Sequence, residues 1–171
     1  MRQIFRNHYI KVETFNFNKD WAAFIDKQNA ERVLSLMDVQ GDNYYCYIFC
    51  HALTGEEEFF LSFSSDHKQE ELSLIHWPYS DLIVLETGRN IYLINTDFTV
   101  RATYPTLYPL LGMYVTANNT LLMLEDIALR IIEAQGNIIA SDTFDVIEDF
   151  SIVNDLLTIQ TGAGERKIIQ L

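Results

Sequence analysis

The stretch Asp81–Asn95, DLIVLETGRNIYLIN, contains two apolar runs joined by Thr87-Gly88-Arg89-Asn90. Short apolar and β-branched runs on either side of a glycine-containing turn predict a β-hairpin. Closely similar stretches return at 120–132, TLLMLEDIALRII, and at 155–168, DLLTIQTGAGERKI. In each copy an acid or amide ends the first run, and these residues are Glu86, Glu125 and Gln160. The chain therefore repeats one hairpin unit.

The openings of the copies, Asp81, Thr120 and Asp155, are separated by steps of 39 and 35 residues. A weaker copy opens at Asn43 and has a longer turn over 53–57. A period of about 35–40 residues with three or four short strands per unit is typical of radially repeated β-meanders. We therefore expect a mainly β fold of antiparallel meanders over residues 42–171, with a β-sandwich as the alternative. Residues 43–171 resemble β-propeller blades in general pattern, which implies a small or incomplete propeller.

The N-terminal part, residues 1–41, has a different pattern. Tyr9 to Phe15 alternates like a strand, and apolar residues recur at three- and four-residue steps from Asn18 to Met37. This spacing predicts one amphipathic helix with Asn18 as its N-cap, covering an edge of the sheet. Together with the meanders it would complete a single domain over residues 1–171.

Acidic residues are distributed unevenly along the chain. Residues 1–41 have a net charge of +1, whereas residues 42–171 have a net charge of −13. No basic residue lies between Arg130 and Arg166. Such a field repels nucleic acid and anionic membranes and attracts a basic protein surface. The alternative is that the acidity only keeps a β-rich protein soluble.

Two acidic clusters are the candidates for binding such a partner. The segment 141–155, SDTFDVIEDFSIVND, contains five acids in fifteen residues, and the long turn at 53–57 leads into three consecutive glutamates. The predicted partner-binding residues are Asp142, Asp145, Glu148, Asp149, Glu56, Glu57 and Glu58. The connection 104–109, YPTLYP, is a further candidate, because tyrosines between strands often reach the surface and recognise proteins.

Motifs for catalysis, cofactors or metals are not visible in the sequence. The four histidines, His8, His51, His67 and His76, form no HxH, HxxxH or HExxH motif, so we expect no catalytic residue and no metal site. Gly162-Ala163-Gly164 is interpreted as a hairpin turn, since no lysine or helix follows to hold phosphate. We expect no cofactor and no enzymatic activity.

The cysteines and the apolar runs indicate the compartment. Cys46 and Cys50 lie four residues apart on a predicted strand, roughly 13 Å, which is too far for a disulfide. We expect buried, reduced thiols. The apolar runs are shorter than the roughly 20 residues that span a bilayer, and residues 1–6 do not form a signal peptide. A cytoplasmic protein is expected.

The leading hypothesis is a non-enzymatic, acidic protein-binding module. In general character the chain is similar to bacterial immunity proteins of the contact-dependent inhibition type, which implies that it neutralises a basic toxin such as a nuclease. One alternative is a small-molecule or sugar-processing β protein with a carboxylate-lined pocket. Another is a structural subunit whose copies pair through sheet edges.

Overall fold

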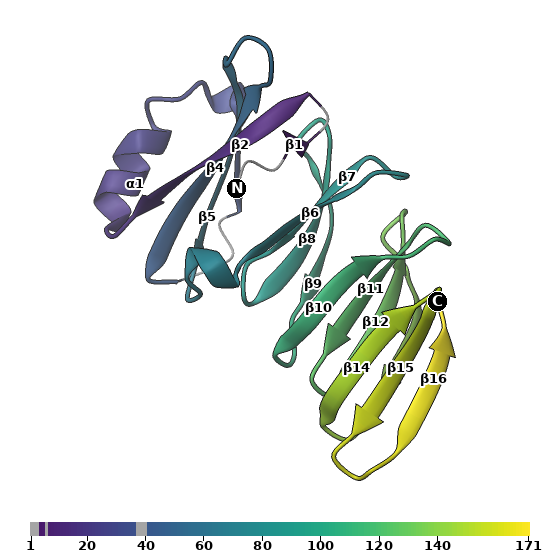
Figure 1. The fold of residues 1–171 in the computed structure, drawn as a ribbon. Coiled ribbons are helices and arrows are strands. Elements are labelled where there is room, and N and C mark those ends of the chain that lie inside the picture. Colours follow the sequence, from purple (N-terminus) through teal and green to yellow (C-terminus); the bar gives the residue numbers. More distant parts are fainter. Residues whose placement is uncertain (1–3, 6, 37–40) are drawn as a thin grey trace. The chain divides into compact units, whose positions relative to one another are not determined.

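A computed structural model describes residues 4–5, 7–36 and 41–171. They form one α-helix and two short 3₁₀ helices, α1 (Asn18–Ile25), η1 (Ala30–Arg32) and η2 (Gln69–Glu71), together with many short strands (Figure 1). The strands are β1 (Ile4–Phe5), β2 (His8–Phe15), β3 (Val33–Leu36), β4 (Asn43–His51), β5 (Glu57–Ser65), β6 (Ser73–Trp77), β7 (Leu82–Glu86), β8 (Asn90–Asn95), β9 (Val100–Pro105), β10 (Leu110–Val115), β11 (Thr120–Glu125), β12 (Ala128–Glu133), β13 (Ile138–Thr143), β14 (Ile147–Val153), β15 (Leu156–Thr161) and β16 (Arg166–Gln170).

These strands form four sheets. Their strand orders are β1-β2-β4-β5-β3, β6-β7-β8-β9, β10-β11-β12-β13 and β14-β15-β16. Neighbours in the last three sheets follow one another along the chain, so each sheet is a meander. The predicted mainly β fold of repeated antiparallel meanders is confirmed. In the first sheet β3 is the exception, because it pairs parallel to β5.

The chain divides into two compact units. Unit 1 comprises Met1–His76 and Leu82–Tyr104, and unit 2 comprises Trp77–Asp81 and Pro105–Leu171. Each unit contains two of the four sheets apart from a few residues at the ends of strands, and each has its own core. The single domain expected from the sequence stays a prediction.

The repeated hairpins occupy matching places in successive sheets. The repeated stretches form the antiparallel hairpins β7–β8, β11–β12 and β15–β16. Each hairpin begins at the second strand of its sheet, and the first strand of that sheet is β6, β10 or β14. A residue with left-handed backbone precedes each hairpin: Asp81 (φ 56°), Asn119 (φ 58°) and Asp155 (φ 59°). Asn and Asp tolerate this conformation better than other non-glycine residues. The sequence repeat therefore corresponds to a structural repeat.

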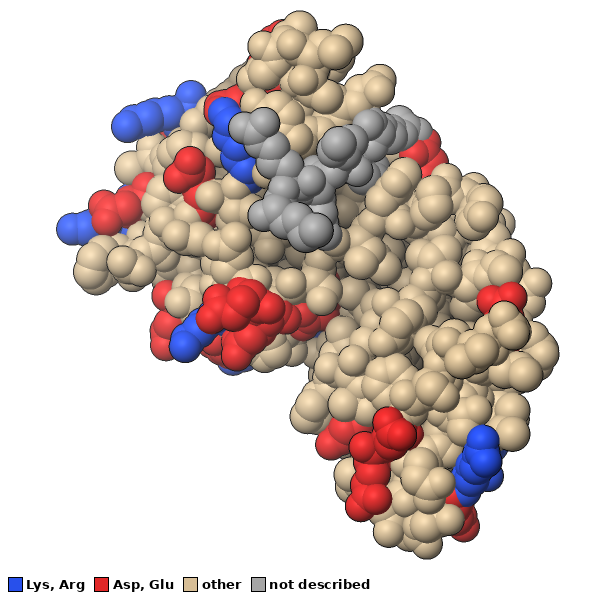
Figure 2. All heavy atoms as spheres, in the orientation of Figure 1, with Lys and Arg blue, Asp and Glu red and all other residues tan. Residues whose placement is uncertain are grey.

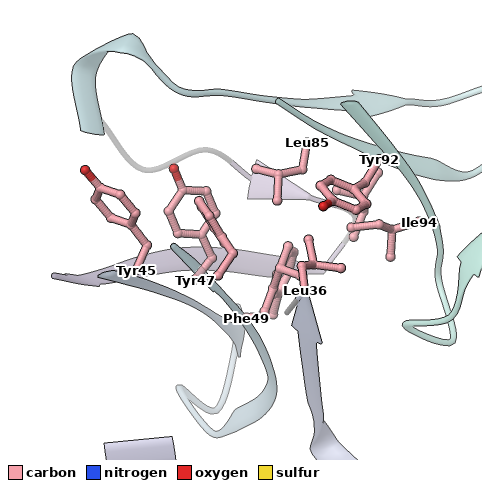
Figure 3. Close-up of a cluster of buried hydrophobic side chains, with 10 residues drawn as sticks. Leu36, Tyr45, Tyr47, Phe49, Leu85, Tyr92 and Ile94 are labelled. Carbon is pink, nitrogen blue, oxygen red and sulfur yellow. The ribbon is translucent and has the colours of Figure 1, made fainter. Parts of the chain in front are cut away.

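The core of unit 1 lies between its two sheets. Alternate residues of β4, namely Tyr45, Tyr47 and Phe49, face Leu85 of β7 and Ile94 of β8 (Figure 3). Tyr47 packs edge-on against Phe63, with ring centroids 5.2 Å apart. The strand period of two thus directs one side of β4 into this core.

The opposite side of β4 is covered by the helix. Cys46, Ile48 and Cys50 form a second cluster, against which Phe24 and Ile25 of α1 pack. Both cysteines are buried free thiols, as predicted. Burial raises the pKa of the Cys46 thiol to about 12, so this group stays protonated at neutral pH.

The predicted helix over Asn18–Met37 is wrong in extent. The helix ends at Ile25, and the apolar residues that follow belong to η1 and to β3, which pairs with β5. Phe17 is the N-cap and makes no side-chain cap, so Asn18 is the first helical residue rather than the cap. The apolar spacing after residue 25 reflects strand packing against the first core, in which Leu36 is buried. Met37 lies outside the described residues.

Candidate functional site

One end of unit 2 is built from loops that are hydrogen-bonded to the turn between β11 and β12. Asp126 N–H donates to Pro109 O at 2.9 Å, and Ile147 N–H donates to Asp126 O at 2.7 Å. Gly162 N–H, in the turn between β15 and β16, donates to Val146 O at 2.8 Å. We call this end the loop surface and define it as residues 105–109, 125–128, 144–149 and 161–164.

A buried ion pair holds the first of these loops in place. Glu125 and Arg130 are almost fully buried, and Arg130 Nη2 lies 2.9 Å from Glu125 Oε1. The same carboxylate oxygen accepts from Leu107 N–H at 2.8 Å, and Arg130 Nη2 donates to Pro105 O at 2.9 Å. Two charged groups from β11 and β12 therefore fix the backbone of 105–109 against the sheet.

The fixed loop presents apolar side chains to solvent. Leu107 is 66% exposed and Tyr108 41% exposed, while Val146 on the neighbouring segment is 49% exposed. Tyr104, the first tyrosine of the predicted recognition segment, is buried. Rigid, exposed aromatic and aliphatic side chains are typical anchors in protein interfaces, because little side-chain freedom is lost when a partner covers them.

The second part of the loop surface carries unpaired acids. Asp145, Glu148 and Asp149 are exposed and make no ion pair within the described residues. A Cβ added to Gly162 would lie 3.4 Å from Glu148 Oε1, so this carboxylate reaches the turn between β15 and β16. No Lys or Arg lies in the four segments of the loop surface. Figure 2 shows acidic atoms gathered at the β14 side of the fourth sheet.

The other predicted acid of this segment, Asp142, has a partner within the chain. Its carboxylate accepts a hydrogen bond from Lys167 Nζ, and this bond lowers the pKa of Asp142. Lys167 also lies 4.9 Å from the ring centroid of Phe144. Asp142 is on β13 and Lys167 is on β16, so this acid is already neutralised by a residue of another sheet.

The glutamates of the second predicted cluster are also paired, and all lie in unit 1. Lys11 Nζ is 3.0 Å from Glu57 Oε1, and Arg32 Nη1 is 3.9 Å from Glu56 Oε1. His8 Nε2 contacts the carboxylate of Glu58. This second cluster is therefore not free charge. Every glutamate of this cluster has a basic group from β2 or η1 beside it.

Three of the four histidines contact neighbouring residues as follows. His8 pairs with Glu58, Thr54 N–H donates to His51 Nδ1 at 3.3 Å, and the ring of His67 packs against Gly88. The described residues contain no group of three or more His, Cys, Asp or Glu side chains placed to hold a metal ion. Among these residues, no helix has the length and apolar character needed to cross a membrane.

The sequence did not predict the Glu125–Arg130 pair, and in the connection 104–109 it pointed to the tyrosines rather than to the exposed Leu107. A signal was available in TLLMLEDIALRII, where Glu125 and Arg130 interrupt two predicted strands that are otherwise mostly apolar. Charged groups are rarely buried without a partner, so an acid and a base on the two strands of one hairpin predict an ion pair. Their hydrogen bonds to the loop depend on tertiary structure.

Solved structures with the same kind of fold support this architecture. BamB from Moraxella catarrhalis has a TM-score of 0.51 and 17% identity, over 78% of this chain and 42% of that chain. The computationally designed Ika4 protein has a TM-score of 0.51 and 10% identity, over 84% of this chain and 99% of that chain. KlHsv2 with loop 6CD replaced by a Gly-Ser linker has a TM-score of 0.52 and 10% identity, over 75% of this chain and 45% of that chain.

These similarities confirm the predicted propeller-like architecture. The chain spans less than half the length of the BamB and KlHsv2 chains that it matches. No protein-family model matches the sequence, and no curated protein matches it. The comparisons therefore show the fold of this chain alone.

Proposed function

We propose that this chain is a non-enzymatic protein-binding module that holds a basic partner on the loop surface of unit 2. The observation that carries the proposal is the combination of exposed Leu107 and Tyr108, held by the Glu125–Arg130 pair, with exposed acids that make no ion pair within the described residues. Apolar anchors supply most of the affinity of an interface, whereas exposed charges speed association and favour a partner of opposite charge.

The finer form of the proposal is an immunity-type inhibitor of a basic toxin such as a nuclease. Its support is electrostatic, because the chain has a net charge of −12 and the loop surface contains no Lys or Arg. Carboxylates on a rigid sheet can occupy a cationic groove in which phosphates would otherwise bind, and long-range attraction speeds capture. Asp145 and Glu148 are the acids expected to do this.

The test begins with the domain encoded by the reading frame next to that of this chain. If that domain is basic, it is purified and titrated against wild type and against the triple variant Asp145→Asn, Glu148→Gln, Asp149→Asn. We expect the association rate to fall at least about tenfold at low salt and the salt dependence to flatten. Leu107→Ala with Tyr108→Ala should instead increase the dissociation rate, since anchors act after encounter.

A matched control removes the same number of charges from unit 1. The triple variant Glu56→Gln, Glu57→Gln, Glu58→Gln takes away carboxylates that already have basic partners, so the association rate should change far less. Equal effects of the two triple variants would mean that only net charge matters. Unchanged affinity in both the acidic and the anchor variants of unit 2 would refute the loop surface as the binding site.

A further inference from the structure

The fourth sheet has one packed face and one exposed face. Leu157 and Ile159 of β15 lie in the core of unit 2, together with the partly buried Phe150, Ile152 and Ile169. The alternate residues form the opposite face, which we call the outer face. Across β14, β15 and β16 its rows are Asp149–Gln160–Arg166, Ser151–Thr158–Ile168 and Val153–Leu156–Gln170.

The outer face differs from the equivalent faces of the other sheets. All five residues of β7 are buried, and so are the last five of β11, whereas the residues of β15 alternate between buried and more exposed. In the first sheet, the face of β4 that points away from the second sheet is covered by α1. Within the described residues, Val153, Leu156 and Ile168 remain 62%, 41% and 58% exposed.

The composition of the outer face is that of a transient interface rather than of a domain core. Val153, Leu156 and Ile168 are apolar, while the positions of Val84 and Glu86 in β7 are taken by Thr158 and Gln160 in β15. Non-obligate interfaces mix polar and apolar area in this way. Nine residues are fewer than the roughly 20–30 per side of a standard interface, so we expect weak association.

The charges of the outer face are arranged in a self-complementary way. Asp149 and Arg166 are at the two ends of one row, and neither makes an ion pair within the described residues. They are two strands apart, roughly 9.6 Å, which prevents direct pairing in one chain. Figure 2 shows acidic atoms on the β14 side of this sheet, and basic atoms with a few acidic atoms next to them on the β16 side.

We propose that the outer face binds the outer face of a second copy of this chain about a two-fold axis parallel to β15. This axis places β14 of each copy over β16 of the other, so Asp149 meets the partner's Arg166 twice. It also places β15 over β15 of the other copy, which brings the two Leu156 side chains together at one end of the face. Such contacts are isologous, and aligned packing of two sheets is a common arrangement.

Sedimentation equilibrium from about 10 µM to 1 mM at 150 mM salt, where repulsion between the net charges is largely screened, tests the proposal. We expect a monomer–dimer equilibrium in wild type. Asp149→Arg alone and Arg166→Asp alone should each weaken dimerisation at least about tenfold, since like charges then face each other. The double variant should dimerise again, because its rows are complementary once more.

A mixture of the two single variants supplies a sharper result. The Asp149→Arg chain has positive charge at both ends of the row 149–160–166, and the Arg166→Asp chain has negative charge at both ends. The two variants should therefore form a heterodimer, although neither dimerises alone. Asp26→Arg and Lys27→Asp make equal charge changes at exposed positions of unit 1 and serve as controls. Asp145→Asn with Glu148→Gln should leave dimerisation unchanged, which separates this proposal from the one for the loop surface.

A monomeric wild type over the whole concentration range would overturn the proposal. A dimer that survives both single reversals would overturn it as well, because the contact would then lie elsewhere. Circular dichroism of each variant checks that the fold is kept.

Discussion

Glu86 and Glu125 occupy the same place in two copies of the repeat, at the end of the second strand of a sheet, and both are buried. Their surroundings differ. Glu125 is paired with Arg130, whereas Glu86 has no ion pair within the described residues and accepts a hydrogen bond from Gly88 N–H. Desolvation by burial raises the pKa of Glu86. Because its pKa is higher in the folded state, its contribution to stability is full below the unfolded pKa and is lost as pH rises.

This difference predicts opposite sensitivities to the same substitution. At pH 7, Glu86→Gln should change the free energy of unfolding by less than about 1 kcal/mol, because it removes a desolvated charge and keeps one acceptor. Glu125→Gln should lower it by roughly 3–5 kcal/mol, since Arg130 is left buried without a counter-charge. Urea unfolding of both variants measures the difference, and equal losses would contradict it.

At the scale of elements, the tight turns combine backbone strain with specific hydrogen bonds. Asn119, with φ 58°, precedes β11, and its side-chain oxygen accepts from Trp77 Nε1 at 2.7 Å and from Ser80 Oγ at 3.0 Å. Trp77 is fully buried, so its N–H needs this acceptor. The turn between β10 and β11 thus also fixes the residues that lead into β7.

Substitutions at Asn119 separate the two contributions. Asn119→Gly keeps the left-handed backbone but removes the acceptor, and should lower the free energy of unfolding by roughly 1–3 kcal/mol. Asn119→Ala should cost about 1–2 kcal/mol more, because a side chain with Cβ is strained at this φ. Thermal or urea unfolding gives the order. A loss from Asn119→Gly equal to that from Asn119→Ala would mean that the backbone conformation contributes nothing.

At the scale of the whole molecule, the net charge of −12 works against the compact state, because acids far outnumber bases in residues 42–171. Part of this charge is paired, as at Glu57 and Asp142. The remainder includes Asp145, Glu148 and Asp149 of the loop surface, which make no ion pair within the described residues. These unpaired acids repel one another in the free protein, and this repulsion lowers its stability.

Salt should therefore stabilise the free protein. Raising NaCl from 10 to 150 mM is expected to increase the urea midpoint of wild type, because screening reduces repulsion among the acids. The triple variant Asp145→Asn, Glu148→Gln, Asp149→Asn should show a smaller increase than wild type. If the salt response is the same in both, these three acids do not contribute to the repulsion.

The sequence by itself determined the repeated hairpins, the mainly β fold and the buried, unpaired cysteines. These features depend on local patterns, namely strand period, turn residues and spacing along one strand. Only the tertiary structure decided the conformation of the residues after 25. Their apolar spacing is compatible with a helix, but residues 33–36 form β3 because they pair with β5 in parallel. Tertiary structure also decided that Phe98 has a left-handed backbone. Its ring stacks on that of Phe59, with the ring centroids 4.2 Å apart.

The same division holds for the candidate site. The acidic segments could be located from the sequence, because the charge of a segment follows directly from its residues. The connection 104–109 was also predicted from the sequence as a recognition segment. Which acids are free depended on residues distant in sequence: Lys11 and Arg32 neutralise Glu57 and Glu56, and Lys167 neutralises Asp142. Ion pairs between such residues arise only when strands are brought side by side. For that reason only the fold could separate the paired acids from the unpaired ones.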